Sequence, residues 1–410
     1  MATFWLQKYY GRYGQCIQII KECTKSEFII HIIIACTNTK SREMKGRTME
    51  IHKKSISAAA VLSGQTTIPK VSVAWRKEVQ GEWDRIAKPL GSFGKLEKIH
   101  TAIGAIQQRR VPDLDRMELL VCCGDHGIVE EGVSQSGQEV TAICAENIGK
   151  GQSCAGILAA AAHAKIRAID VGIHGPGPVP GTEFRRVTDG TKNFLKEPAM
   201  SRAQFRTALQ LGLDLAAECR EAGVRVLGVG EMGIGNTTSA AVLAGRMLGL
   251  SAETVTGRGA GLDRAGLQRK RKVIAAALKM PDVSSDVEAI WCRFGGLELT
   301  AMMGIILGGG LHGIPVVLDG LLSLVSAEAA ERLVPGIREY MIPSHISREP
   351  AARLLTESLG LEPVLDAGMG AGEGVGAVMM MSLLRDVNRV YREAKRFDGY
   401  GMEPYTRYEE

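Results

Sequence analysis

The 410-residue chain has few aromatic residues, 5% of the total, and it lacks long hydrophobic runs. Its most apolar segment near the start, residues 28–36, is far shorter than the ~20 residues that cross a bilayer. We therefore expect no membrane partner. The nine cysteines include no C-x-x-C pair and show no metal-ligand spacing. This pattern predicts reduced thiols in a cytoplasmic protein and no metal site.

Several signatures of nucleotide and acyl chemistry are also absent. The chain has no GxxxxGK[ST], no GxGxxG followed by a ribose-binding acid at the usual distance, and no GxSxG elbow. It also lacks the pair of adjacent acids before a Gly/Thr loop that metal-dependent diphosphate-sugar transferases use. These absences argue against a P-loop enzyme, a dinucleotide dehydrogenase and a serine hydrolase, and we expect no cofactor.

Basic charge is concentrated at the start of the chain. Residues 1–48 contain eight Lys/Arg and three acids. Because the whole chain has 50 basic and 45 acidic residues, the remaining body has 42 of each sign. The neutral body predicts no nucleic-acid partner. Residues 1–48 are interpreted as an atypical extension without an assigned function, and Met49 is an alternative start of translation.

The 49 glycines cluster in short loops between apolar and helical patterns. Continuous apolar runs predict strands at 117–123, 166–171, 224–229 and 314–318, and helical periodicity fills the intervals, for example at 202–222. This alternation predicts an α/β fold, a Rossmann-like parallel sheet with helices on both faces. The loops "GDHG", "GEMGIGN", "LDG" and "GMGAGEGVG" should then share the rim where the strands end.

We also expect a smaller helical domain. Helices predicted at 75–86 and 94–109 assign residues 49–115 to it, and later segments contribute to it as well. Residues 116–385 are predicted to form the α/β catalytic domain, and residues 386–410 a C-terminal helix and tail.

The segment "GVGEMGIGNTTSAA" has the layout of a strand, a glycine turn and a helix. Free amides at a helix N-terminus bind anions, and a capped structural turn is the alternative interpretation. The candidate anion-binding residues are Gly233, Ile234, Gly235, Asn236 and Thr237, with Asn236 or Thr237 placed to cap the helix. Glu231 would repel a phosphate, so the loop is predicted to bind phosphate at one end and a neutral or cationic group at the other.

Two further glycine-rich segments carry charge. "TGRGAGLDRAGLQRK", residues 256–270, runs into a basic helix in which Lys270 or Arg271 could face a phosphate, although a solvated helix face explains either residue alone. "GMGAGEGVGA" places five glycines around Glu373. Glycine costs backbone entropy, so this density indicates a close approach of backbone to a ligand. Asp125, His126 and His345 are weaker candidates, because internal turns explain them equally well.

Eleven ordered motifs, among them "GDHGIVEEGVS", "GVGEMGIGNTTSAA", "PVVLDGLLS", "IPSHISREP" and "GEGVGA", cover about residues 71–385. Together they resemble the nicotinate-nucleotide–dimethylbenzimidazole phosphoribosyltransferase family of cobamide lower-ligand activation. The resemblance implies transfer of ribose 5-phosphate from nicotinate mononucleotide to a lower-ligand base such as 5,6-dimethylbenzimidazole. The products are α-ribazole 5′-phosphate and nicotinate. It also implies a homodimer, with a heterodimer of paralogues as the alternative.

The resemblance assigns roles to individual residues. Glu373 takes the ring N–H proton of the incoming base. Glu231 faces the ribose as it becomes cationic. Lys270 and Ser347 contact the phosphate and ribose of the nucleotide. The implied base pocket contains Ser136, Cys144 and Met369.

Two departures from the family pattern lie near the acceptor. Cys144 stands where some members carry glutamine. Up to the catalytic glutamate the chain reads "MGAGE", whereas the family usually reads Met-Arg-Leu-Gly-Glu, so Gly370 replaces the arginine and Ala371 the leucine. Loss of that arginine removes a possible partner of Glu373. We therefore expect an altered base pocket that favours a purine, a substituted benzimidazole or a phenolic base. The alternatives are one subunit of a heteromeric paralogue and a non-catalytic nucleotide sensor.

Overall fold

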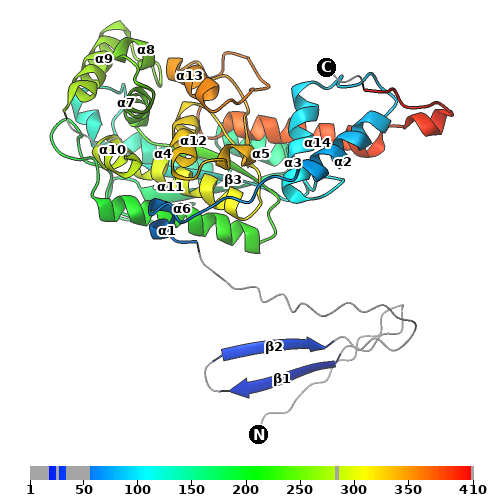
Figure 1. Cartoon of the computed structure of the whole chain (residues 1–410). Coiled ribbons are helices and arrows are strands. Elements are labelled where there is room, and N and C mark those ends of the chain that lie inside the picture. The colour runs from blue at the N-terminus through cyan, green and yellow to red at the C-terminus, as the bar shows by residue number, and fades with distance from the viewer. Residues whose placement is uncertain (1–17, 25–26, 34–55, 282–285, 408–410) are drawn as a thin grey trace. The chain divides into compact units, whose positions relative to one another are not determined.

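A computed structural model describes residues 18–24, 27–33, 56–281 and 286–407 (Figure 1). The chain divides into two compact units, residues 1–54 and residues 55–410. In the first, β1 (Gln18–Thr24) pairs antiparallel with β2 (Glu27–Ile33). The rest of the extension predicted at 1–48, and Met49, lie outside the described residues.

The second unit is built around a six-stranded sheet. Its strands are β3 (Met117–Gly124), β4 (Lys165–Gly172), β5 (Glu183–Phe184), β6 (Val226–Met232), β7 (Val316–Val317) and β8 (Met341–Ile342). Their order is β5-β4-β3-β6-β7-β8, and every neighbouring pair is parallel. The strand order therefore reverses between β3 and β6, which is the position where open α/β sheets bind ligands.

Helices and short 3-10 turns connect the strands. The helices are α1 (Ala58–Leu62), α2 (Val73–Arg85), α3 (Lys95–Gln107), α4 (Glu139–Gly149), α5 (Cys154–Ala161), α6 (Arg202–Glu221), α7 (Asn236–Leu248), α8 (Ala252–Val255), α9 (Arg264–Lys279), α10 (Val287–Phe294), α11 (Leu297–Leu311), α12 (Leu321–Leu333), α13 (Pro350–Ser358) and α14 (Val375–Glu393). The 3-10 turns are η1 (Gly127–Glu131), η2 (Ile337–Tyr340) and η3 (Phe397–Tyr400). In the part of the chain that the structure describes, no helix is long and apolar enough to cross a membrane.

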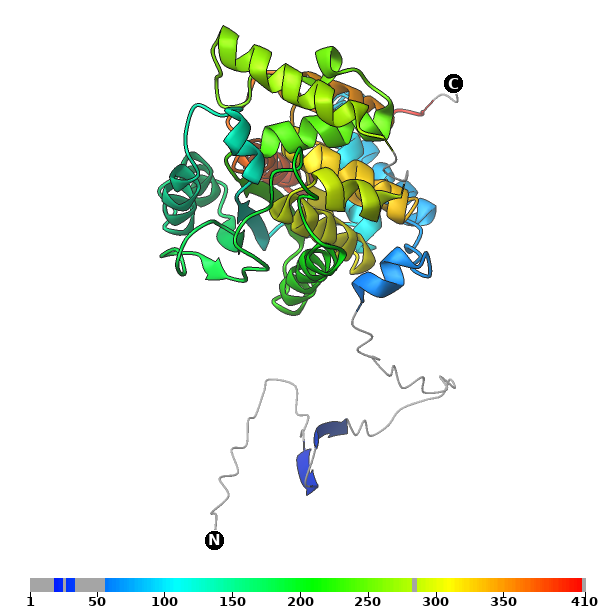
Figure 2. The same cartoon turned by 90° about the vertical axis from the view of Figure 1, so that its left-hand side faces the viewer.

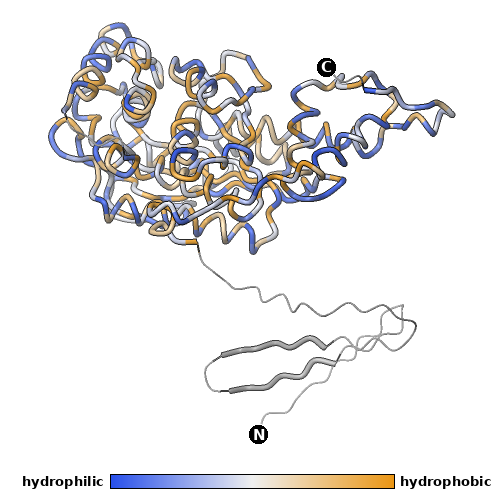
Figure 3. Tube along the Cα trace, in the orientation of Figure 1, coloured by the Kyte–Doolittle hydropathy of each residue, from blue (hydrophilic) through white to orange (hydrophobic). Residues whose placement is uncertain are grey.

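Both faces of the sheet are covered, which confirms the predicted α/β architecture. Leu120 and Cys122 of β3 belong to a core formed with α6, α7, α11 and α12. Leu119, Val121 and Cys123 point the other way, into a core formed with α4, α5 and α14. This alternation follows from the two-residue period of a strand. α9, at the upper left in Figure 1, carries both hydrophilic and hydrophobic residues (Figure 3), whereas α11 is buried along almost its whole length.

Two of the sequence-based strand limits needed correction, and two short strands were not predicted. The predicted strand 224–229 runs from Val226 to Met232, so Glu231 lies within β6 and not in the following loop. The predicted strand 314–318 shortens to the two residues of β7. The two-residue strands β5 and β8 were not predicted, because two residues carry no readable period.

α6 and α11 lie against each other on one side of the sheet (Figures 1 and 2). Gly212 and Gly304 permit this packing: a Cβ at Gly304 would lie 2.8 Å from the Cα of Gly212 and would clash with the carbonyl oxygen of Leu209. We expect Gly304→Ala to lower the free energy of unfolding by about 1–3 kcal/mol in urea titrations, since rigid backbone opposes the added methyl group.

Gly81 in α2 provides the matched control. Outside the backbone of its own helix, no described atom lies within 4 Å of a Cβ placed there, so Gly81→Ala should raise stability by about 0.5–1 kcal/mol through helix propensity. Equal stabilisation by both substitutions would contradict this account of the helix packing.

α2, α3 and the end of α14 pack together at one end of this unit (Figure 1). Trp83 donates a 3.2 Å hydrogen bond to His100 Nδ1, and the other His100 ring nitrogen lies 3.0 Å from Asn388 Oδ1. Burial lowers the pKa of His100 to about 4, so this histidine is neutral and structural. α14 continues through residue 386, and the domain boundaries at 49–115, 116–385 and 386–410 stay predictions.

Candidate active site

A cavity of about 570 Å³ opens beside the carboxyl ends of β6, β7 and β8. Its lining comes from residues 231–234, 236–237, 256–261, 319–322, 345, 347–350 and 370–373, with Leu267. The loops after β6 and β7 and the glycine-rich loop before α14 therefore meet, as predicted. Among the described residues that line the cavity, none comes from the "GDHG" loop.

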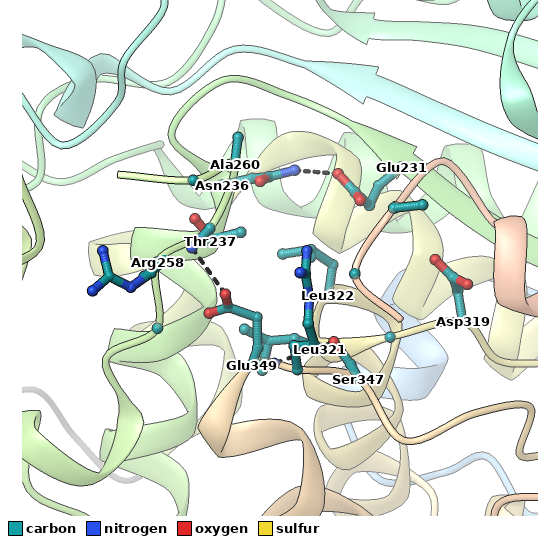
Figure 4. A pocket seen from close by; sticks show the side chains of 18 of the residues that line it. Glu231, Asn236, Thr237, Arg258, Ala260, Asp319, Leu321, Leu322, Ser347 and Glu349 are labelled. Carbon is teal, nitrogen blue, oxygen red and sulfur yellow. Dashed lines mark hydrogen bonds between the residues drawn. The ribbon is translucent and has the colours of Figure 1, made fainter. Parts of the chain in front are cut away.

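The cavity has two chemically different ends. In Figure 4, Thr237, Arg258 and Glu349 lie on one side, and Glu231 and Asp319 lie on the other. The carboxyl groups of Glu231 and Asp319 favour a positively charged group at their end of the cavity, and the end that carries Arg258 and free amides favours an anion. The arrangement suits a substrate that is anionic at one end and cationic at the other.

Glu231 is a buried carboxyl group at the end of β6. Its side chain accepts a hydrogen bond from Asn236 Nδ2, and the residue is 8% exposed. Burial, together with the negative charges of Asp319 and Glu298, raises the pKa of Glu231 to about 8. In the ligand-free site Glu231 is therefore mostly protonated at pH 7. A bound cationic group would lower this pKa and stabilise the ionised form.

The prediction that Asn236 or Thr237 caps α7 is wrong. The N-cap is Gly235, whose φ of 97° lies in the left-handed region that glycine tolerates. Asn236 uses its side chain to hold Glu231, and the Thr237 hydroxyl accepts a 2.7 Å hydrogen bond from Lys270 Nζ. Both side chains therefore bind charged groups of the site and do not cap the helix.

The loop offers fewer free amides than the sequence predicted. The Ile234 N–H donates to Thr141 Oγ1 at 3.1 Å, and the Asn236 N–H donates to the Gly233 carbonyl at 3.3 Å. The amides of Gly233, Gly235 and Thr237 donate to no residue in the described ranges. Of these three residues, Gly233 and Thr237 line the cavity, so they are the remaining amide candidates for an anion.

The Asp125–His126 pair is internal. Thr141 donates a 2.6 Å hydrogen bond to Asp125, whose pKa burial raises to about 6. The His126 ring nitrogens lie 2.9 Å from Ser239 Oγ and 2.7 Å from Glu298 Oε1, and all three residues are fully buried. Of the two interpretations of "GDHG", the internally satisfied turn is the one that the structure supports.

Lys270 lies behind the wall of the cavity. It is fully buried, and burial lowers its pKa to about 8, an effect that nearby Glu349 opposes. Gly259 lines the cavity next to this pair: a Cβ there would lie 2.7 Å from Thr237 Oγ1 and 3.2 Å from Lys270 Nζ. The Gly259 N–H donates to Glu349 Oε1 at 2.9 Å. An anion bound at this end would thus lie next to the Thr237 hydroxyl and the charge of Lys270.

Asp319 fixes the start of α14. Its carboxylate accepts N–H hydrogen bonds from Gly374, Gly376 and Ala377 at 3.2, 2.8 and 3.3 Å. Burial raises the pKa of Asp319, and neighbouring His345, 3.8 Å away through Nδ1, opposes this rise. Because Glu373 immediately precedes these amides, Asp319 positions the Glu373 loop.

Glu373 is a strained residue in that loop. Its φ of 58° is left-handed, which non-glycine residues rarely adopt. Its Oε2 accepts a 3.5 Å hydrogen bond from the Ala155 N–H in the first turn of α5. Gly230 allows the loop to approach β6, since a Cβ there would lie 2.6 Å from the Glu373 carbonyl oxygen. Strain of this kind is typical of functional positions.

The comparisons with known proteins agree with this geometry. The phosphoribosyltransferase family model matches residues 68–401. The nicotinate-nucleotide–dimethylbenzimidazole phosphoribosyltransferase of Escherichia coli strain 536 is 40% identical over 328 residues, which cover 79% of this chain and 91% of that protein. The same enzyme from Escherichia coli strain SE11 is 40% identical over 331 residues. The chain belongs to this family.

Solved structures support the same conclusion. CobT from Thermus thermophilus is similar with a TM-score of 0.76 and 38% identity, covering 80% of this chain and 99% of that one. The structure of the nicotinate-nucleotide–dimethylbenzimidazole phosphoribosyltransferase of the same organism is similar with a TM-score of 0.75 and 37% identity. The predicted family, enzyme class and Rossmann-like fold are confirmed, and the chain is a phosphoribosyltransferase.

Within this family framework, the cavity contains most of the predicted catalytic and nucleotide-binding residues. Those on its wall are Glu231, Gly233, Ile234, Asn236, Thr237, Ser347 and Glu373. Lys270 lies behind the wall, hydrogen-bonded to Thr237, and Gly235 is turned toward η1, where a Cβ would lie 2.9 Å from Val129. His345, one of the weaker candidates, is also on the wall.

The predicted base pocket is not assembled in this cavity. None of the described lining residues is Ser136, Cys144 or Met369. Cys144 does lie near Glu373, since the Glu373 charge adds to burial in raising the pKa of the Cys144 thiol. Met369 packs against the core on the α14 side of the sheet, and the Ser136 N–H donates to Ser134 Oγ at 3.2 Å. The base-pocket assignment stays a prediction.

Sequence reasoning did not single out several charged groups of the site. These are Arg258, Asp319, Arg348 and Glu349. Asp319 had one usable signal, its place directly after a short apolar run in "VVLDG". In the described ranges, no group of three or more His, Cys, Asp or Glu residues could hold a metal ion, and metal-free chemistry stays a prediction.

Proposed function

We propose that the protein transfers ribose 5-phosphate from nicotinate mononucleotide to a ring nitrogen of a lower-ligand base, giving α-ribazole 5′-phosphate and nicotinate for cobamide assembly. The observation that carries this proposal is the two-ended cavity. Thr237, backed by Lys270, faces the phosphate, while Glu231 and Glu373 face the reacting sugar and base. The relatives named above support the choice of donor and acceptor.

The reaction breaks one bond at the ribose C1′ and forms another. As the C1′–pyridinium bond breaks, its electron pair returns to the pyridine nitrogen, so nicotinate leaves without a general acid. The unprotonated ring nitrogen of the base attacks C1′, and the proton on its other ring nitrogen passes to the Glu373 carboxylate, so the product base is neutral. Glu231 is ionised by the bound cation and stabilises the positive charge that develops on the ribose.

The acceptor base is the part of the function on which this chain departs from its family. Cys144 lies near Glu373, and no arginine precedes Glu373 in its loop. We infer an altered base pocket that favours a purine, a substituted benzimidazole or a phenolic base.

The test of this acceptor preference is a competition. Nicotinate mononucleotide is incubated with equal concentrations of dimethylbenzimidazole, adenine and a phenol, and the products are quantified by mass. We expect products from more than one class of acceptor. A strong preference for dimethylbenzimidazole over adenine and phenol would contradict the altered pocket and leave the transferase function in place.

We further propose a homodimer in the cytoplasm. Ile143 on α4 and Ile157 on α5 are apolar residues that are 58% and 63% exposed, and a second copy would cover them. A heterodimer with a paralogue would use the same surface. The placement in the cytoplasm rests on free thiols, such as Cys122, Cys123 and Cys219 in the core.

A further inference from the structure

Arg348 is a cation on the cavity wall whose guanidinium has no partner in the described part of the chain. The group forms no hydrogen bond or ion pair with those residues. Instead it lies against Gly370, where a Cβ would be 2.7 Å from Nε and 2.9 Å from Nη2. The φ of Gly370 is not left-handed, so the position of Arg348, and not backbone strain, disfavours a side chain at 370.

Contacts of the neighbouring backbone place Arg348 at the carboxylate end of the cavity. Its N–H donates to the Met369 carbonyl at 2.9 Å, which joins this segment to the Glu373 loop. The next residue, Glu349, turns to Gly259 at the phosphate end. Two residues beyond Gly370, the chain approaches Glu231, since a Cβ at Gly372 would lie 3.1 Å from Glu231 Oε1.

The position of Arg348 determines which anionic group of the substrate it can bind. The phosphate end already has Thr237 with Lys270 behind it. The second anionic group of nicotinate mononucleotide is the carboxylate on the pyridine ring, and that ring leaves at the end where Glu231 and Glu373 lie. A guanidinium matches a carboxylate with two parallel hydrogen bonds.

We propose that Arg348 binds the carboxylate of the nicotinate group and so selects nicotinate mononucleotide over the nucleotide with a neutral carboxamide. This inference rests on the proposed function. It also accounts for "MGAGE": the cation that the family places before the catalytic glutamate is supplied here from position 348, and Gly370 leaves room for it.

The test measures binding of nicotinate mononucleotide and nicotinamide mononucleotide by calorimetry. The two ligands share the phosphate and differ at the ring substituent. For Arg348→Ala we expect about tenfold or weaker binding of nicotinate mononucleotide and little change for nicotinamide mononucleotide. Arg353→Ala is the matched control, an exposed arginine on α13 outside the cavity wall, and should change neither.

A reciprocal variant separates recognition from a structural role. In the double variant Arg348→Ala, Gly370→Arg, the guanidinium comes from position 370 and points into the volume that Arg348 filled. This variant should restore most of the lost affinity for nicotinate mononucleotide. Equal weakening of both nucleotides would assign Arg348 to the phosphate and overturn the proposal, and so would no change in either. A wild-type protein that binds neither nucleotide would instead refute the proposed function.

Discussion

Replacing Glu373 with glutamine is expected to lower kcat by two to four orders of magnitude, the range typical of removing a general base. Glutamine keeps the size of the side chain and can still accept the Ala155 N–H, but it cannot take the proton of the incoming base. The Asp319 anchor on Gly374, Gly376 and Ala377 is unaffected, so the loop should keep its shape. Binding of nicotinate mononucleotide should change little.

The measurement for Glu373→Gln combines steady-state rates with calorimetric titration of the nucleotide. Glu362→Gln, which alters an exposed carboxyl group between α13 and the same loop, is the matched control and should have wild-type rates. If the protein were a non-catalytic nucleotide sensor, the wild type itself would show no turnover. Undiminished kcat in Glu373→Gln would remove Glu373 from the mechanism, and loss of nucleotide binding in parallel would point to a structural role.

Glu231→Gln should produce the second large effect, and this effect should depend on pH. The pKa of Glu231 is raised from its ordinary 4.5 to about 8 in the free protein, so the ionised fraction falls about tenfold for each pH unit below 8. Because kcat/KM reports the free enzyme, we expect wild-type kcat/KM to rise with pH up to about 8. At pH 9 Glu231→Gln should be slower by about 100-fold.

The difference between the two proteins should nearly vanish at pH 6, where Glu231 is protonated and resembles glutamine. The same shift predicts a stability effect. The pKa of Glu231 is higher in the folded state than in the unfolded state, so the folded protein loses stability as the pH rises through the folded-state pKa. We therefore expect the Tm of the wild type to fall more between pH 5 and 9 than the Tm of Glu231→Gln. Parallel pH profiles for rate and Tm in both proteins would contradict the assignment of the Glu231 pKa.

Much of the fold could be predicted because its signals are local. β3 is an eight-residue run in which every residue is buried, and α6 begins with a capping box at Ser201 and Gln204. Such elements carry their pattern within one stretch of sequence. β5 and β8 have two residues each and exist only because a neighbouring strand pairs with them.

The site could be predicted in part for the same reason. The glycines around Glu231 and Glu373 mark places where backbone must come close, and both carboxylates reach one cavity. The role of Asn236 could not be read from sequence, because it depends on the left-handed N-cap at Gly235. The pairing of Asp319 with the start of α14 joins segments more than fifty residues apart, and no local pattern reveals it.

Arg348 and Gly370 illustrate the same limit at the scale of a single contact. In sequence, Gly370 is a missing arginine beside a catalytic glutamate. In space, another arginine fills the volume that a side chain at position 370 would take. Only the three-dimensional fold brings the two positions together.

The most direct test of the central claim is to incubate the purified protein with nicotinate mononucleotide and each candidate base and to follow nicotinate release and product mass together. The account predicts one nicotinate released for each phosphoribosylated base, no release when the base is omitted, and release slowed by about two to four orders of magnitude when Glu373 is glutamine. Nicotinate release that is independent of the base, or tight nucleotide binding without any product, would contradict it.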